Sequence, residues 1–228
     1  MITPMKHIAV GLTGLVLVAA ASLKATPVTV QEVGIGPNQV VSITSSLLGG
    51  PVSVYAGVVK LKVDGTAMNG FCIDPWHWSV SSPLAYDLRP LAQAPAWPAP
   101  MGSTAALEIE RLWDNYYTPG ISGVTAAALQ IEIWKIVDTA EPAASFTLVS
   151  APASVTTMMG VMETWLGGDL SGSPAAWLSA VVSTQYTRDT KVGQDYVIPG
   201  VPEGGWTVTL VGIGLLGLLL IRRSRKNA

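Results

Sequence analysis

Hydrophobic and polar residues alternate along the first part of the chain in the manner of antiparallel strands. β-Branched residues are frequent there, and turn-forming residues recur at short intervals. The pattern predicts strands over 28–33, 39–48 and 52–63, separated by Gly36-Pro37-Asn38 and by Gly49-Gly50-Pro51.

The third of these strands leads into a hairpin. Apolar residues at 59, 61 and 63 alternate with two lysines, so one face of the strand is expected to be buried and the other wet. Asp64-Gly65 is typical of a two-residue hairpin turn. The returning strand, 66–73, carries Cys72 near its end.

The second half of the chain changes to helical spacing. Apolar side chains recur at i, i+3, i+4 and i+7, which places them along one stripe of a helix. Pro119-Gly120 and Gly167-Gly168 act as breaks. The predicted helices cover 103–117, 124–137 and 154–166.

The segment between the strands and the helices has little periodicity. Residues 75–101 contain six prolines, so we expect a long irregular surface loop. Two closing strands are predicted over 176–186 and 194–198. Together the elements predict one α+β unit over 26–200, a β-sheet or sandwich-like domain with an insertion of about three helices.

The N-terminal segment resembles a secretory signal peptide. Residues 1–25 hold Lys6 and then an apolar run from Ile8 to Ala21, which ends in small residues (Ala19, Ala20 and Ala21) where a signal peptidase could cut. The alternative, a buried helix of the domain, lacks the polar face that a packed surface helix needs.

The C-terminal segment predicts a single transmembrane helix. Residues 206–221 form an uncharged run of sixteen residues. As a helix the run reaches about 24 Å at about 1.5 Å per residue, which is short for a hydrocarbon core of roughly 30 Å. The basic cluster that follows should stay on the cytoplasmic side and hold the body outside. Its members are Arg222, Arg223, Arg225 and Lys226.

Three features in this order resemble the PEP-CTERM sorting signal of Gram-negative bacteria: a Pro-Glu motif, a short apolar helix and a terminal Arg cluster. The motif is Val201-Pro202-Glu203-Gly204-Gly205, and the resemblance covers 201–228. It implies processing by a membrane protease of the exosortase type and delivery to the cell surface or extracellular matrix. The alternative is an ordinary tail anchor without processing. In both cases the body is exported across the inner membrane.

Charge separates these ends from the body. The whole chain has a net charge of −2, but residues 26–200 hold seven Lys and Arg against fourteen Asp and Glu. The body is therefore acidic, and nucleic acids and acidic polysaccharides are poor partners for it.

Gln130 stands at an unexpected place in the second predicted helix. It shares the apolar face with Ile133, Trp134 and Val137. A buried carboxamide without partners costs roughly 1–3 kcal/mol, and the ordinary solution is a hydrogen bond to a neighbouring backbone. Glu132 lies about 200° from Gln130 around the helix, so it is expected to face solvent.

Cys72 is the only cysteine of the chain. A disulfide framework within the chain is therefore excluded. A lone thiol in an exported protein is usually buried, paired between chains or used in chemistry, and burial as a small hydrophobe is the plain alternative.

The surroundings of these two residues resemble the bacterial thioester domains of Gram-positive surface adhesins. The matching segments are Gly70-Phe71-Cys72-Ile73-Asp74, at the end of a hairpin, and Ala128-Leu129-Gln130-Ile131-Glu132-Ile133-Trp134, on a helix. The resemblance implies an internal thioester in which Cys72 supplies the sulfur and Gln130 the acyl group, with loss of ammonia. It also implies adhesion through covalent attachment to a surface amine or hydroxyl, on a polysaccharide or a protein.

A thioester lasts only where water is excluded, so an apolar pocket is expected around it. The residues predicted to form that pocket are Phe71, Asp74, Trp76, His77 and Trp134. His77, the only histidine outside the signal peptide, is a candidate general base for the attacking group. The alternative is a packed loop aromatic.

Two other functions remain open at this point. One is non-covalent binding to a matrix or carbohydrate by exposed tryptophans such as Trp76, Trp78 and Trp97, with Cys72 buried and unreactive. The other is hydrolysis, which is disfavoured because a lone histidine leaves few partners for a catalytic triad. We therefore expect a binding protein that is no enzyme and uses no cofactor or metal.

Overall fold

The computed structural model describes residues 25–45, 50–95, 99–140, 145–168, 174, 177–185 and 192–200. All but the last residue of the predicted signal peptide lies outside these ranges, as do the predicted sorting motif, transmembrane helix and basic cluster. Among the described residues no helix is both long and apolar enough to cross a membrane.

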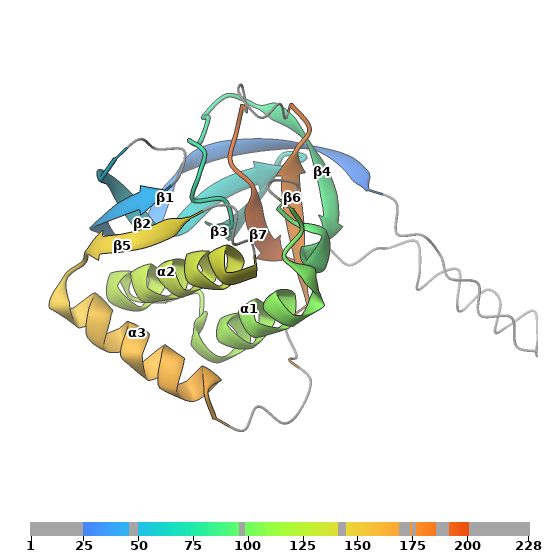
Figure 1. Ribbon diagram of the computed structural model, residues 1–228. Coiled ribbons are helices and arrows are strands. Elements are labelled where there is room, and N and C mark those ends of the chain that lie inside the picture. Colours follow the sequence, from blue (N-terminus) through green and yellow to red (C-terminus); the bar gives the residue numbers. More distant parts are fainter. Residues whose placement is uncertain are drawn as a thin grey trace, which may run out of the picture.

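In the part of the chain that the structure describes, seven strands form one antiparallel sheet (Figure 1). Their order is β2-β3-β7-β6-β4-β1-β5, and β2 also pairs with β1, so six strands close into a ring that β5 extends. Of the two expected forms, a β-sheet or a sandwich-like domain, the sheet is confirmed and the sandwich is not, because a single sheet curls on itself. The strands are β1 (Thr26–Ser45), β2 (Val52–Val63), β3 (Thr66–Cys72), β4 (Leu84–Pro90), β5 (Phe146–Ser150), β6 (Leu178–Ser183) and β7 (Tyr196–Pro199).

Strand β1 runs without interruption through Gly36-Pro37-Asn38, where a break was predicted. Its register against β2 shifts between Glu32 and Gly34 and again between Ile35 and Asn38. Each shift places one extra residue in β1, and such bulges bend a strand and increase its twist. The bend lets the first part of β1 pair with β4 and the last part with β5, on the side away from β2.

Strand β4 lies inside the segment that was predicted to be an irregular loop. Its hydrogen-bonded neighbours are β1 and β6, so it closes the ring. Leu84, Tyr86 and Leu88 alternate with less apolar residues, which is a strand pattern that the flanking prolines obscured. Proline is tolerated at strand ends, and Pro90 is the last residue of β4.

Among the described residues between β4 and β6 there are three α-helices, so the α+β class and the helical insertion are confirmed. Helix α2 packs against β1, β2 and β3, with α1 beside it and α3 on its outer side (Figure 1). Ser122 accepts a hydrogen bond from the Thr125 N–H at the start of α2, as an N-terminal cap does. The helices are α1 (Gly102–Tyr116), α2 (Gly123–Ala140) and α3 (Ala153–Leu166), and a 3-10 turn, η1, covers Leu91–Gln93.

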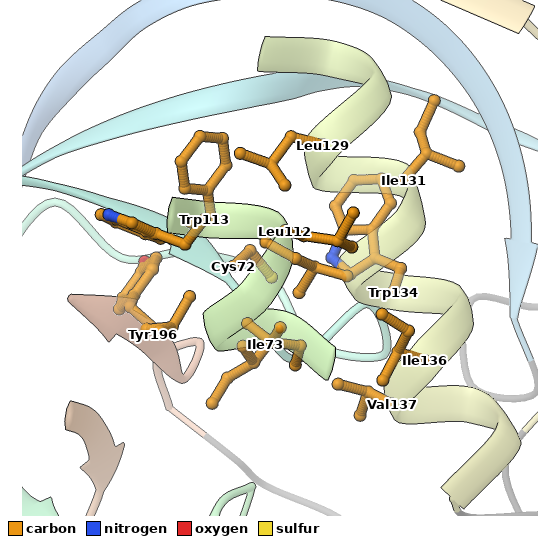
Figure 2. Close-up of a cluster of buried hydrophobic side chains, with 14 of the residues drawn as sticks. Cys72, Ile73, Leu112, Trp113, Leu129, Ile131, Trp134, Ile136, Val137 and Tyr196 are labelled. Carbon is orange, nitrogen blue, oxygen red and sulfur yellow. The ribbon is translucent and has the colours of Figure 1, made fainter. Parts of the chain in front are cut away.

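The core is centred on α2. Every residue from Ala126 to Trp134 is buried, because the sheet covers one side of the helix and α1 and α3 cover the others. A helix enclosed in this way is apolar nearly all round. Figure 2 shows side chains of α1 and α2 gathered with Cys72, Ile73 and Tyr196 in one buried cluster.

The contact between Gly57 and the second bulge tests this architecture. Gly57 pairs with Asn38 at a φ of 148°, and a Cβ there would lie 2.7 Å from the Asn38 Cα and against the Pro37 carbonyl. We expect Gly57→Ala to lower the free energy of unfolding by roughly 2–5 kcal/mol, from backbone strain and overpacking together. Urea denaturation followed by circular dichroism measures the change.

Gly120→Ala is the matched control, because a Cβ at Gly120 meets nothing within 4 Å. Equal stability of the two variants would contradict the tight bulge.

Candidate functional site

Cys72 and Gln130 come together from the strand hairpin and the central helix. Cys72 is the last residue of β3, and Gln130 lies in the middle of α2. They are 3% and 1% exposed, respectively. The predicted apolar face of α2 is confirmed, since Gln130, Ile133, Trp134 and Val137 are all buried.

Two hydrogen bonds join the Gln130 carboxamide to the backbone of Cys72. The Cys72 N–H donates to Oε1 at 2.9 Å, and Nε2 donates to the Cys72 carbonyl at 2.7 Å. The plain explanation of a buried glutamine, a bond to a neighbouring backbone, is therefore met. The backbone concerned belongs to the one cysteine of the chain, so the same contact fixes the carboxamide beside the thiol-bearing residue.

The thiol itself accepts a hydrogen bond. The Asp74 N–H lies 3.2 Å from Sγ, within the reach of a sulfur acceptor. This bond fixes the orientation of the Cys72 side chain at the end of β3. The Cys72 N–H withdraws electrons from the Gln130 carbonyl in the same way that an oxyanion-hole donor does. Both bonds favour attack of sulfur on the carboxamide carbon.

A pocket of about 320 Å³ opens onto this pair. Of the predicted residues, it is lined by Cys72, Gln130, His77 and Trp134. Its rim includes Tyr55 and Trp78, whose exposed fractions are 62% and 59%. The other lining residues are Glu32, Ile35, Ile43, Ser53, Val54, Val59, Pro75, Ser79 and Gln194.

Phe71 and Trp76 do not line the pocket, contrary to the prediction. Side chains of neighbouring strand residues point to opposite faces, so the Phe71 side chain turns away from that of Cys72. Its ring packs edge-on against Trp113, with 5.4 Å between the ring centroids. Trp76 is 2% exposed and belongs to the core. The prediction that Trp76 is an exposed binding tryptophan is therefore wrong. Trp97, for which the same was predicted, lies outside the described residues.

Asp74 is placed behind the pocket wall. It is fully buried, and its Oδ1 lies 2.7 Å from Nδ1 of His77. The predicted pocket position of Asp74 is therefore wrong in detail, but Asp74 contacts a residue that does line the pocket. The side chain of His77 is 10% exposed, so the imidazole is neither fully packed nor a solvated loop aromatic.

Sequence reasoning missed Gln194 and Glu32. Gln194 Nε2 donates to the carbonyls of His77 at 2.7 Å and Asp74 at 3.3 Å, which fixes the loop after β3. Glu32 lines the pocket and accepts a hydrogen bond from Tyr196 at 3.1 Å. Both are far from Cys72 in the chain, and no local pattern distinguishes them from surface polar residues.

Two tyrosines form the polar layer beneath the site. Burial, and after it the charges of Asp195, Asp74 and Glu32, raises the pKa of Tyr86 far above the ordinary phenol value. Burial, and after it Tyr86 and Glu32, does the same for the pKa of Tyr196. Both therefore remain neutral donors. Tyr86 donates to the Gln194 carbonyl at 3.0 Å, and Tyr196 donates to Glu32.

Within the described ranges, no three His, Cys, Asp or Glu side chains come together as metal ligands do. No protein-family model matches this chain, and none of the curated proteins or solved structures compared with it matches either. A function must therefore be argued from the geometry of the site.

Glu132 does not face solvent, which corrects the expectation from the helical wheel. It is 2% exposed because α3 covers the side of α2 that points away from the sheet. Lys135 lies 3.2 Å from Glu132 and also pairs with Glu163 of α3. Burial raises the pKa of Glu132, and Lys135 opposes that rise only in part.

This raised pKa predicts a pH-dependent effect of Glu132→Gln. The folded state binds the Glu132 proton more tightly than the unfolded state does, so ionised Glu132 lowers stability above its folded pKa. We expect Glu132→Gln to raise the free energy of unfolding by about 0.5–1.5 kcal/mol at pH 7. The gain should shrink as the pH falls through the raised pKa and disappear below the ordinary glutamate value. Thermal unfolding at several pH values measures it.

Glu163→Gln is the control, because Glu163 pairs with the same lysine but its side chain is 51% exposed. Its effect should stay within about 0.5 kcal/mol. A Glu132→Gln variant that is less stable at pH 7 than at pH 4, relative to the wild type, would contradict the assignment.

Proposed function

We propose that this protein forms an internal thioester between Cys72 and Gln130 and uses it for covalent attachment to a surface. The observation that carries the proposal is the pair of hydrogen bonds that holds the Gln130 carboxamide on the backbone of Cys72. The resemblance of the two sequence segments to thioester domains supports it, as does the pocket that both residues line.

The chemistry needs only these two side chains. Sγ of Cys72 attacks the side-chain carbonyl carbon of Gln130, the bond from that carbon to Nε2 breaks, and Nε2 leaves as ammonia with the thiol proton. In the second stage a partner's amine or hydroxyl attacks the same carbon and the carbon–sulfur bond breaks. An amide or ester then remains at Gln130, and Cys72 recovers its thiol.

Burial suits a bond of this kind. Cys72 and Gln130 are almost inaccessible from the outside, and their pocket is walled by Ile43, Val59 and Trp134. Few water molecules can reach the thioester, while one face stays open to an incoming group. The site reacts once, since nothing in the scheme restores the thioester after attachment.

The location follows from the two ends of the chain. We propose that residues 1–25 direct export, that 206–221 anchor the protein in the membrane, and that an exosortase-type protease acts near Pro202-Glu203. The acidic body is then displayed at the cell envelope or in the extracellular matrix, where it meets surface amines and hydroxyls. In this scheme the domain is a binding protein and no enzyme.

Intact mass spectrometry tests the thioester. Freshly purified protein should weigh one ammonia less than the mass calculated from its sequence. Methylamine should then add to Gln130 and leave an N-methylamide, which makes the protein heavier than that calculated mass by one CH2 group. Cys72 should resist alkylation before methylamine and accept it afterwards. These features follow because thioester formation consumes both the thiol and the carboxamide nitrogen.

Cys72→Ala and Gln130→Ala are the controls, and both should show the full mass and no adduct. A wild-type protein of full mass with a freely alkylated Cys72 excludes the covalent function.

Non-covalent binding is the second candidate, and one observation favours it. Tyr55 and Trp78 are exposed at the rim of the pocket, where aromatic faces are available to stack on a sugar or another ring. In that case Tyr55→Ala and Trp78→Ala would abolish retention on the target, and Cys72→Ala would not.

A further inference from the structure

We propose that His77 is the general base of the attachment reaction and that Asp74 and Gln194 position it. The proposal rests on the thioester function argued above. It adds the group that takes the attacker's proton and returns it to the leaving sulfur.

The first observation is the pairing of His77 with a fully buried carboxylate. Nδ1 of His77 lies 2.7 Å from Oδ1 of Asp74, and Asp74 is 0% exposed. An ionised Asp74 selects the tautomer with the proton on Nδ1 and leaves Nε2 as the basic nitrogen. It also stabilises the imidazolium that forms when Nε2 takes a proton.

The second observation is the position of the pair. His77 lines the same pocket as Cys72 and Gln130, so a group that attacks Gln130 passes the imidazole. Asp74 ties the two together, since its N–H donates to Sγ of Cys72 at 3.2 Å while its carboxylate contacts His77. One short loop thus holds the leaving sulfur and the base in a fixed relation.

The third observation is the support from β7. Gln194 lies just before this strand, and its Nε2 donates to the backbone carbonyls of both Asp74 and His77. The Gln194 carbonyl in turn accepts from Tyr86, a buried tyrosine of β4. The loop that carries the base is therefore fastened to the segment before β7, the neighbour of β3, and through that segment to β4.

The proton balance of the step closes without another reactant. The attacker's oxygen or nitrogen bonds to the Gln130 carbonyl carbon while Nε2 of His77 takes its proton. The carbon–sulfur bond then breaks, and the Cys72 thiolate takes that proton from Nε2. His77 ends neutral, as it began.

Other titratable groups around His77 define what the test must separate. Glu32 shares the pocket and is held by Tyr196, and Cys72 is the leaving group. Tyr86 lies behind the loop and feels the charges of Asp195 and Asp74. Among the described residues that line the pocket, Glu32 is thus the rival carboxylate base, and the phenol of Tyr55 is the remaining titratable group.

Glycerol is the decisive probe because an alcohol must lose its proton as it attacks and does not titrate near neutral pH. With the wild-type protein, the rate of glycerol adduct formation should rise with pH through one inflection, because only the neutral imidazole can take the alcohol's proton. His77→Asn should lower the rate at pH 7.5 by roughly 100-fold or more and abolish the inflection. Asp74→Asn should lower it by roughly tenfold or more. The same substitutions should lower the rate of reaction with methylamine by a smaller factor, because methylamine is a stronger nucleophile than glycerol.

Each variant is first checked for the mass deficit of one ammonia, which reports on the thioester alone. Three results would overturn the role of His77 and leave the thioester proposal intact. They are a flat wild-type pH profile, a His77→Asn variant that reacts with glycerol at the wild-type rate, and loss of the inflection in Glu32→Gln. Full mass in the wild-type protein would overturn both proposals. A flat wild-type pH profile overturns the role of His77 even if a variant fails to fold.

Discussion

The two hydrogen bonds between the Gln130 carboxamide and the Cys72 backbone join the helical layer to the sheet at a buried point. A carboxamide in the core is costly unless its donors and acceptor are met, and here one residue's N–H and C=O meet both. Residues on both sides of Gln130 in α2 are buried, so the helix cannot turn to bring another side chain to this place. The orientation of α2 on the sheet and the geometry of the site are therefore fixed together.

The ring of strands supplies the other half of this constraint. Cys72 ends β3, which pairs with β2 on one side and β7 on the other, so its backbone is held from both directions. The bulges of β1 provide the bend that lets the ring close. The loop after Cys72 would be free to move in an open hairpin, but Gln194 binds its carbonyls from the start of β7. A rigid strand end next to a fixed loop would hold the proposed Cys72–Gln130 thioester in a constant geometry.

Much of the site was within reach of the sequence, for reasons that differ from residue to residue. Cys72 and Gln130 were recognised because each violates a local rule: a lone thiol in an exported chain, and a carboxamide on an apolar face. The resemblance to thioester domains predicts that these two residues lie close together, whereas their separation in the chain does not. Phe71 and Trp76 were misassigned because aromatic character alone does not tell which side of a strand or loop a ring occupies. Glu132 was misplaced because the helical wheel assumed one buried face, and α3 covers the opposite face as well.

The sequence by itself determined the α+β class, the positions of the three helices, the hairpin that ends in Cys72 and the apolar face that carries Gln130. These depend on periodicity and turn chemistry, which act over a few residues. Only the tertiary structure decided the closure of the sheet, the strand hidden among prolines at 84–90, the contact of Asp74 with His77 and the roles of Gln194 and Glu32. Those features join residues that are distant in the chain or select one side-chain direction among several. Packing of the whole domain, and no local preference, makes that selection.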